Sequence, residues 1–415
     1  MKTYLVWGLG KSGLSAVQLL KEKGCKVYSG DDAKGDSWEE FIDSVDVVVL
    51  SPGVPPRHPL WKEALKRDIE VIGELELAYR FFEGDVVAIT GTDGKSTTTR
   101  LTSLMLSKKI KDVHEAGNIG TPLSEVVMSD PKSTAVVEVS SFQGRTLNTF
   151  RPSVGAFLNF HEDHLDWHPD LGDYLRSKHN IFSRQEPRDT FIAGSLQDEV
   201  LSTPTQADRV VVDREVVVAE GRVLFRGELL FELGDLRLKG AHNLKNAVVA
   251  SIIARLKGVS TEDIREVLRE FRGLPFRMEL VKVWRGVEIY NDSKSTTPNA
   301  LKAALESFPD GSVILIAGGK DKGADFKPLR ETAERKLKLA FLIGETRESM
   351  KTAFGGGSNI KTMSSLEEAV DSALRVAEPG DFVLFSPGCS SFDMFSSYVE
   401  RGEAFNTLIE ERCKL

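Results

Sequence analysis

The sequence predicts an α/β protein of three domains with mainly parallel sheets. Apolar runs of strand length alternate with segments of helical period almost throughout the 415 residues, which is typical of parallel sheets covered by helices. The alternation restarts at DVVAITG (85–91) and again after FRGLPFR (271–277). A chain of this length is also too long for a single hydrophobic core. We therefore expect domains at about 1–83, 84–272 and 273–415.

The first strand, within TYLVWG, leads into a glycine-rich loop and a helix. Gly8, Gly10 and Gly13 have the spacing of a dinucleotide-binding loop, and Asp31 ends the next strand. Such a loop and helix N-terminus can accept a diphosphate, which predicts a Rossmann-like first domain. A dehydrogenase, another diphosphate ligand and glycines that only permit close packing all fit this motif. Ser51, in SPGVPP after a later strand, could bind a phosphate or cap a turn.

A second glycine-rich loop, ITGTDGKSTTTR (89–100), opens the middle domain. Gly94, Lys95 and Ser96 match the end of the G-x-x-x-x-G-K-[ST] phosphate loop, but Ile89 stands in place of its first glycine. Backbone N–H groups, the lysine and the serine can serve ATP phosphates and Mg²⁺. The alternative is a glycine- and threonine-rich turn that binds no ligand. We predict an ATP-binding, P-loop-like central sheet, to which the alternating pattern of 205–240 adds antiparallel strands.

Acidic and histidine residues follow two later strands of the middle domain. Glu138 ends the apolar run AVVEVSS, where a charge needs a partner or a metal. His161, His164 and His168 in NFHEDHLDWH suggest zinc, but the many oxygen donors in this segment favour Mg²⁺ with a single histidine. We expect the other two histidines to be solvated or turn residues.

Lys178 lies on the apolar stripe of a helix predicted over 173–182, together with Tyr174, Leu175 and Ile181. A snorkelling lysine is one interpretation. The other is functional, because a desolvated lysine has a lowered pKa. Its neutral amine can react with CO₂ to form a carbamate, which is an anionic metal ligand.

Further polar segments lie at a helix start and after several strands of the last two domains. Ligands of α/β proteins bind at the carboxyl ends of such strands. Together they indicate a ligand face. Their candidate residues are Asn243, Asn246, Arg277, Asp292, Lys294, Thr296, Lys320, Lys322, Ser390, Ser391 and Phe392.

Composition and charge narrow the function classes. The net charge is −8, which argues against a general nucleic-acid surface and favours small-molecule partners. Three cysteines without metal-ligand spacing suggest a reducing compartment. Neither a signal peptide nor an apolar run of about 18 residues is evident. We expect a cytoplasmic protein without a membrane span.

Ten motifs in order resemble the ATP-dependent Mur ligases of peptidoglycan synthesis over nearly the full chain. They are GTDGKSTTT, GNIG, EVSSFQ, NFHEDHLDWH, YLRSK, GAHNLKN, GLPFRME, NDSKSTTPNA, GGKDKGADF and SPGCSSFDMF. The third-domain motifs are most similar to the members that join D-glutamate to UDP-MurNAc-L-Ala. The resemblance implies a Rossmann-like third domain, cytoplasmic cell-wall synthesis and a monomer.

The resemblance also implies roles for individual residues. ATP and a first Mg²⁺ would be served by Gly91, Thr92, Asp93, Gly94, Lys95, Ser96, Thr97, Asn243, Asn246, Arg277 and Asp292. A second Mg²⁺ would be held by Glu138, His164 and carbamylated Lys178, and Lys294 would lie near the reacting phosphate. UDP-MurNAc-L-Ala would be bound by Lys11, Ser12, Asp31, Ser51 and Asn118, and D-glutamate by Thr296, Lys322, Ser391 and Phe392.

Two positions depart from the family pattern. Asp93 stands where the loop usually has Asn, and Trp167 where Arg is common. A folylpolyglutamate synthase-like ligase is the nearest alternative, but the intact diphosphate loop argues against it. A sugar-nucleotide dehydrogenase would leave 85–100 and 291–326 unexplained, and Lys178 argues against a non-catalytic regulator.

Overall fold

The computed structural model describes residues 2–165, 167–238, 240–321 and 323–414. Its contacts divide the chain into two compact units. Unit 1 comprises Met1–Arg237 and Ala241–Phe271, and unit 2 comprises Leu238–Gly240 and Arg272–Leu415. The predicted segments 1–83 and 84–272 both lie mainly in unit 1, where each has a sheet of its own. The exact domain limits stay a prediction.

The first sheet of unit 1 is four-stranded and parallel, in the order β2-β1-β3-β4. Its elements are β1 (Thr3–Trp7), α1 (Lys11–Glu22), β2 (Lys26–Gly30), β3 (Val47–Leu50), α2 (Pro59–Lys66), β4 (Glu70–Gly73) and α3 (Glu74–Tyr79). The buried strands β1 and β3 end beside each other, so the loops that follow them meet at one edge.

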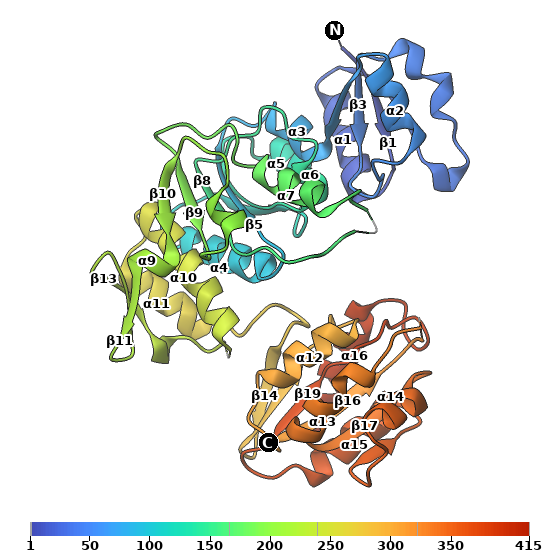
Figure 1. Cartoon of the computed structure of the whole chain (residues 1–415), viewed down its shortest axis with the longest axis vertical. Coiled ribbons are helices and arrows are strands. Elements are labelled where there is room, and N and C mark those ends of the chain that lie inside the picture. Colours follow the sequence, from blue (N-terminus) through green and yellow to red (C-terminus); the bar gives the residue numbers. More distant parts are fainter. Residues whose placement is uncertain (1, 166, 239, 322, 415) are drawn as a thin grey trace. The chain divides into compact units, whose positions relative to one another are not determined.

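The second sheet of unit 1 has six parallel strands in the order β10-β9-β8-β5-β7-β6 (Figure 1). The strands are β5 (Asp85–Thr90), β6 (Val113–Gly117), β7 (Thr134–Glu138), β8 (Val154–Phe157), β9 (Thr190–Ala193) and β10 (Asp208–Val211). The intervening helices are α4 (Lys95–Ser107), α5 (Leu123–Ser129), α6 (Ser141–Gly144), α7 (Leu171–His179), α8 (Asp198–Leu201) and α9 (Val212–Glu215).

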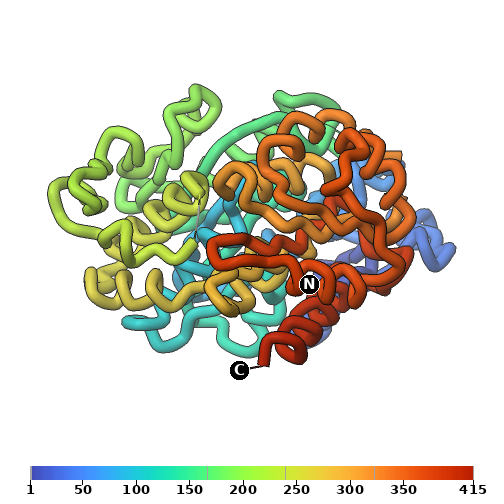
Figure 2. The backbone as a smooth tube through the Cα atoms, turned by 90° about the horizontal axis from the view of Figure 1, so that it is seen from below, coloured from blue at the N-terminus to red at the C-terminus, as the bar shows by residue number. Residues whose placement is uncertain are grey.

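The predicted antiparallel addition is present but shorter than expected. It consists of β11 (Val216–Ala219), β12 (Arg222–Phe225) and β13 (Glu228–Glu232). Residues 208–211 instead form β10, which pairs in parallel with β9 and belongs to the six-stranded sheet. Two helices, α10 (Ala241–Leu256) and α11 (Thr261–Glu270), complete the unit, and α10 packs along α4 (Figures 1 and 2).

Unit 2 contains one six-stranded sheet in the order β14-β15-β19-β16-β17-β18, parallel except for the edge strand β14. Its strands are β14 (Glu279–Trp284), β15 (Val287–Asn291), β16 (Val313–Gly318), β17 (Leu337–Ile343), β18 (Ile360–Thr362) and β19 (Phe382–Phe385). Its helices are α12 (Pro298–Glu306), α13 (Arg330–Lys336), α14 (Arg347–Ala353), α15 (Leu366–Val376) and α16 (Tyr398–Arg412). The predicted α/β class, with mostly parallel sheets and a small antiparallel addition, is confirmed.

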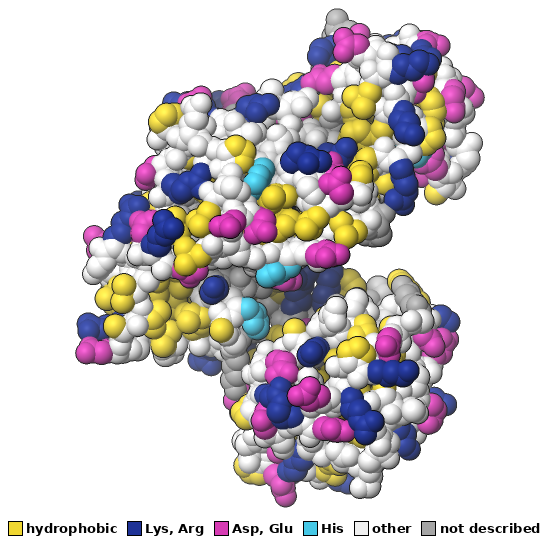
Figure 3. Space-filling model, viewed as in Figure 1, with side chains coloured by type: hydrophobic (Ala, Val, Ile, Leu, Met, Phe, Trp, Pro, Cys, Tyr) yellow, Lys and Arg dark blue, Asp and Glu magenta, His cyan; other side chains and the backbone are white. Residues whose placement is uncertain are grey.

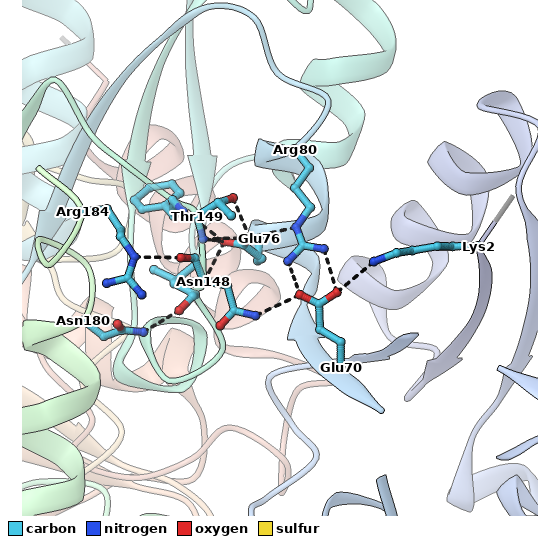
Figure 4. A network of polar contacts seen from close by, with 10 residues as sticks. Lys2, Glu70, Glu76, Arg80, Asn148, Thr149, Asn180 and Arg184 are labelled. Carbon is cyan, nitrogen blue, oxygen red and sulfur yellow. Dashed lines mark hydrogen bonds and ion pairs between the residues drawn. The ribbon is translucent and has the colours of Figure 1, made fainter. Parts of the chain in front are cut away.

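A polar network joins the two sheets of unit 1 (Figure 4). Glu70 at the start of β4 accepts hydrogen bonds from Arg80 and from the side chain of Asn148. The fully buried Glu76 accepts from Arg80 and from the backbone N–H groups of residues 148–150. Because every oxygen of this buried carboxylate is hydrogen-bonded, its burial is tolerated.

Acidic and basic side chains alternate over the face in Figure 3, without one extended basic field among the residues described there. This is in keeping with the net charge of −8. In the described part of the chain, no helix is both long and apolar enough to span a membrane.

Candidate active site

The loop between β5 and α4 has the geometry of a phosphate-binding turn. Gly94 has a φ of 81°, and a Cβ on it would lie 2.2 Å from Oδ1 of Asn246 in α10. Glycine is therefore required both for the backbone conformation and for the approach of α10. Asn159 accepts hydrogen bonds from the N–H groups of Thr92 and Asp93. The loop is thus fixed before any ligand binds.

The charged and hydroxyl groups of this loop lie at the N-terminus of α4. Lys95 Nζ donates to the carbonyl oxygens of Gly91 (3.0 Å) and Thr92 (2.7 Å), so the lysine is folded back over the loop. Ser96 is buried and Thr97 half-buried in the first turn, whereas Asp93 is exposed. Exposure explains how the loop tolerates the acidic residue.

Lys178 is buried in α7, with 1% of its surface exposed. This excludes the snorkelling interpretation. Its Nζ donates to Gly91 O at 2.6 Å and lies 4.7 Å from the centroid of the Tyr174 ring. The pKa of Lys178 is held well below its usual range, mainly by burial and secondly by the nearby Lys95 cation. A neutral amine next to the phosphate loop is the state that reacts with CO₂.

Glu138 at the end of β7 is 1% exposed. Its Oε1 accepts a hydrogen bond of 2.6 Å from the side chain of Asn118, and its Oε2 has no partner among the described residues. Lys11 of the first glycine loop donates to Gly120 O in the same GNIG segment. The GNIG segment therefore connects the first glycine-rich loop with Glu138 at the end of β7.

The candidate metal ligands include oxygen donors that suit Mg²⁺. No group of three or more His, Cys, Asp or Glu side chains suited to a metal is found in the described ranges. However, the orphaned Oε2 of Glu138 and the hydroxyl of Ser96 are oxygen donors of the type Mg²⁺ prefers. Lys178 would become such a donor on carbamylation, so the residues fit this metal.

His164 and His168 differ in their surroundings. His164 has a φ of 56°, its side chain is 41% exposed, and its ring packs on Phe142. His168 is only 2% exposed and is hydrogen-bonded to Asp173 and Ser141. His168 was expected to be a solvated or turn residue, and it lies in a turn, because its N–H donates to His164 O. Its side chain is nevertheless enclosed between α6 and α7.

The first glycine loop is held by side chains that follow neighbouring strands. A Cβ on Gly13 would lie 1.9 Å from Gly8 O, so α1 approaches the strand too closely for any other residue. Ser51 Oγ donates to Gly8 O at 2.5 Å. Asp31 accepts from the N–H groups of Leu9 and Ala33, and these bonds lower its pKa. Asp31 thus shapes the loop, while Lys11 and Ser12 lie on its outer side.

A pocket of unit 1 opens where the two sheets meet. It is lined by Ser51, Trp61 and Gly73 from the first sheet's segments and by Phe142 and Trp167 from the second's. Its walls combine aromatic, aliphatic and polar side chains, with a serine beside the first glycine-rich loop. Trp167 supplies part of the apolar lining.

In unit 2, Asp292 follows β15 and is 7% exposed. Its oxygens accept from Ser386 Oγ at 2.8 Å and Met278 N at 3.1 Å. Burial raises the pKa of Asp292 to about 7, although Ser386, Met278 and Arg277 oppose the shift.

Lys294 is paired with an aromatic residue that the sequence did not single out. Its Nζ lies 3.0 Å from Tyr398 Oη at the start of α16. The same helix supplies Arg401, which is fully buried and donates to Ser293 O and Cys389 O. Arg401 therefore ties the loop after β15 to the loop after β19.

The other candidates of unit 2 stay predictions. Thr296 and Arg277 are exposed, Ser391 is buried, and Phe392 is 63% exposed. Lys320 is paired with Glu345. Lys322 lies outside the described residues.

Sequence reasoning missed Ser141, Asp173, Tyr398 and Arg401. Ser141 lies in the EVSSFQ motif and Asp173 in the helix predicted over 173–182, whereas Tyr398 and Arg401 lie beyond the SPGCSSFDMF motif. The only signal was an aromatic and a basic residue following SPGCSSFDMF, at the start of a helix.

A buried strand, a glycine turn, and a lysine and serine at a helix N-terminus define a nucleoside-triphosphate-binding α/β protein. Residues 89–254 match the Mur ligase middle domain, and residues 276–389 match the Mur ligase glutamate ligase domain. The chain belongs to the Mur ligase family.

Curated relatives resemble the chain over almost its whole length. A UDP-N-acetylmuramoylalanine–D-glutamate ligase of Aquifex aeolicus is 56% identical over 408 residues, covering 98% of each chain. One of a Hydrogenobaculum species is 48% identical, again covering 98% of each. Both relatives are UDP-N-acetylmuramoylalanine–D-glutamate ligases.

Solved structures support the three-domain Mur ligase fold. UDP-N-acetylmuramate-alanine ligase of Thermotoga maritima has a TM-score of 0.60 at 17% identity, covering 99% of this chain and 100% of that one. The MurF ligase of the same organism, in complex with ADP, has a TM-score of 0.59 at 18% identity, covering 90% and 92%. A folylpolyglutamate synthase of Mycobacterium tuberculosis also shares the fold, with a TM-score of 0.56 and 79% of this chain covered.

Proposed function

We propose that the protein joins D-glutamate to UDP-N-acetylmuramoyl-L-alanine with ATP, releasing ADP and phosphate. The observation that carries this proposal is the buried Lys178, with a lowered pKa, hydrogen-bonded to the phosphate loop at Gly91. Relatives of this name at 56% and 48% identity support the choice of substrates. The reaction would take place in the cytoplasm, and the enzyme would be a monomer.

The proposed ligand residues come from all three proposed domains. Residues 1–83 would hold the nucleotide through the loop of Gly8 and Ser51, with the pocket of unit 1 beside the sugar. Residues 84–272 would hold ATP at Lys95 and Asn246. Residues 273–415 would hold D-glutamate, with Lys322, Ser391 and Phe392 as the proposed ligands.

In the first step, an oxygen of the L-alanine carboxylate would attack the γ-phosphorus of ATP, and ADP would leave. Lys95 would exchange its loop carbonyls for phosphate oxygens, and Lys294 would add a second positive charge. Ser96, Glu138, His164 and Lys178 would hold two Mg²⁺ ions. When bound, these ions supply screening of the repulsion between the carboxylate and the phosphates.

In the second step, the amine of D-glutamate would attack the acyl carbon. The carbon–oxygen bond to phosphate would break, and the amine would lose a proton. The charged side chains that surround the phosphate loop would again stabilise the departing anion.

An isotope experiment tests this route. The substrate is prepared with ¹⁸O in both oxygens of the alanine carboxylate, and the released phosphate is examined by mass spectrometry. We expect one ¹⁸O in each phosphate, because the bond that breaks is the one between carbon and that oxygen. Phosphate without ¹⁸O would contradict an acyl phosphate.

A further inference from the structure

Three buried side chains form a hydrogen-bonded chain beside the candidate metal ligands. His168 Nδ1 lies 2.7 Å from Asp173 Oδ2, and His168 Nε2 lies 2.9 Å from Ser141 Oγ. The exposed fractions of these residues are 2% for Ser141 and His168 and 8% for Asp173. Since the Asp173 carboxylate can only accept, Nδ1 carries the proton and Nε2 accepts from the serine hydroxyl.

Each of the three residues lies on a segment that also carries one candidate metal ligand. Ser141 follows Glu138 by three residues, at the start of α6. The backbone N–H of His168 donates to His164 O at 2.9 Å. Asp173 shares helix α7 with Lys178. The chain of hydrogen bonds therefore connects the segments of all three ligands.

The packing of α6 on α7 makes this connection rigid. A Cβ on Gly144 would lie 2.2 Å from Ser177 O, so the two helices are in close backbone contact. Arg145, which caps α6, forms an ion pair with Asp173. Asn180 donates to Gly144 O at 2.9 Å and Leu147 O at 2.7 Å. His168 thus lies between two helices that are in direct backbone contact.

The order serine, histidine, aspartate is also that of hydrolase triads. There the serine hydroxyl must be reached by a substrate carbonyl. Ser141 is 2% exposed and sits in the first turn of a buried helix. Its burial makes a nucleophilic role incompatible with this structure and leaves support of neighbouring groups as its role.

We propose that His168, held between Ser141 and Asp173, is a positioning residue that fixes Glu138, His164 and Lys178 in the geometry for binding a divalent cation. The inference rests on the proposed function, since that function supplies the reason for the metal. Partners of this kind, which orient ligands without touching the ion, typically change metal affinity about 10- to 100-fold when they are removed.

Binding of Mn²⁺ without turnover tests the inference. Mn²⁺ is titrated into the full-length enzyme with UDP-MurNAc-L-Ala but without nucleotide, and the free ion is measured by electron paramagnetic resonance. Omitting ATP removes the triphosphate-bound metal, and a titration of UDP-MurNAc-L-Ala without enzyme gives the Mn²⁺ that the diphosphate itself binds, which is subtracted. We expect Ser141→Ala and Asp173→Asn each to weaken Mn²⁺ binding about 10-fold.

Asp189→Asn is the matched control. Asp189 is buried and paired with Arg151, as Asp173 is with Arg145, but it lies at the amino end of β9, whereas Glu138 lies at the carboxyl end of β7. We expect Asp189→Asn to lower the melting temperature about as much as Asp173→Asn while leaving Mn²⁺ affinity unchanged.

Three results would contradict the inference. If folded Ser141→Ala and Asp173→Asn bound Mn²⁺ with wild-type affinity, the positioning role would be overturned and the proposed function would stand. Labelling of Ser141 by a fluorophosphonate would show an accessible nucleophile and would also overturn it. No saturable Mn²⁺ binding by the wild type would overturn both the inference and the metal site of the proposed function.

Discussion

Lys178 Nζ donates a hydrogen bond of 2.6 Å to the carbonyl oxygen of Gly91, which joins a buried lysine of α7 to the phosphate loop. The lysine lies where a positive charge is disfavoured by burial and by Lys95. This relationship connects the chemistry of the amine with the binding of ATP, and the first prediction follows from it.

Lys178→Ala is expected to reduce turnover by about 100-fold or more, because the second metal would lose an anionic ligand. Formate or acetate should restore part of the activity by replacing the carbamate. Turnover is measured with and without added carboxylate. Lys95→Ala, which removes a phosphate contact, is the control and should show no rescue. Equal rescue of both variants would contradict the carbamate role.

Gly94→Ala is expected to destabilise unit 1 for two reasons. The φ of 81° is strained for alanine, at a cost of about 1–2 kcal/mol. The new Cβ would also overlap Asn246, adding about 1–3 kcal/mol. Gly35→Ala isolates the first effect, because Gly35 has a φ of 73° and nothing lies within 4 Å of its Cβ position. If Gly94→Ala and Gly35→Ala lowered the free energy of unfolding in denaturant equally, the overlap with Asn246 would contribute nothing.

Glu70 makes the stability of unit 1 depend on acid pH. Its bond with Arg80 is the largest cause that lowers the pKa of Glu70 from 4.5 to about 2. A depressed folded-state pKa gives stability that is complete above pH 4.5 and is lost as the pH falls toward 2. Allowing for partial exposure, Glu70→Gln should cost about 1–2 kcal/mol at neutral pH.

Unfolding of Glu70→Gln and wild type is compared across the acid range. The difference between them should shrink as the pH falls, whereas the exposed Glu40→Gln should differ little from wild type throughout. A difference that stays constant down to pH 2 would show that Glu70 contributes by packing and not by charge.

Asp292 gives the opposite pH dependence in unit 2. Burial raises the pKa of Asp292 from 3.8 to about 7. Its contribution to stability is complete below pH 3.8 and is lost as the pH rises through about 7. Asp292→Asn should therefore gain about 1–3 kcal/mol relative to wild type between pH 5 and 8. The exposed Asp325→Asn should show no such gain. If the free energies of unfolding of Asp292→Asn and wild type differed by the same amount at every pH, the raised pKa of Asp292 would be refuted.

The fold could be predicted from the sequence where the pattern within a single segment determines its structure. Strand β5 is an apolar run followed by glycines, and the apolar stripe of α7 correctly placed Lys178 in the interior. The strand at 208–211 was assigned to the wrong sheet, because alternation does not reveal which neighbour a strand pairs with. The pairing with β9 is decided by tertiary packing.

The site was harder to predict where two distant segments meet. Lys294 and Tyr398 are in contact, although 104 positions separate them. His168 was expected to be a solvated or turn residue, and it lies in a turn, yet its side chain is buried and hydrogen-bonded to Ser141 of α6 and Asp173 of α7. No local pattern encodes such contacts, since they arise from how helices pack on the sheet.

Phosphate release with one component left out tests the central claim most directly. ATP, UDP-MurNAc-L-Ala and D-glutamate are supplied together, and then each is omitted in turn. We expect rapid phosphate release only when all three are present. Equal turnover when meso-diaminopimelate or L-lysine replaces D-glutamate would contradict it.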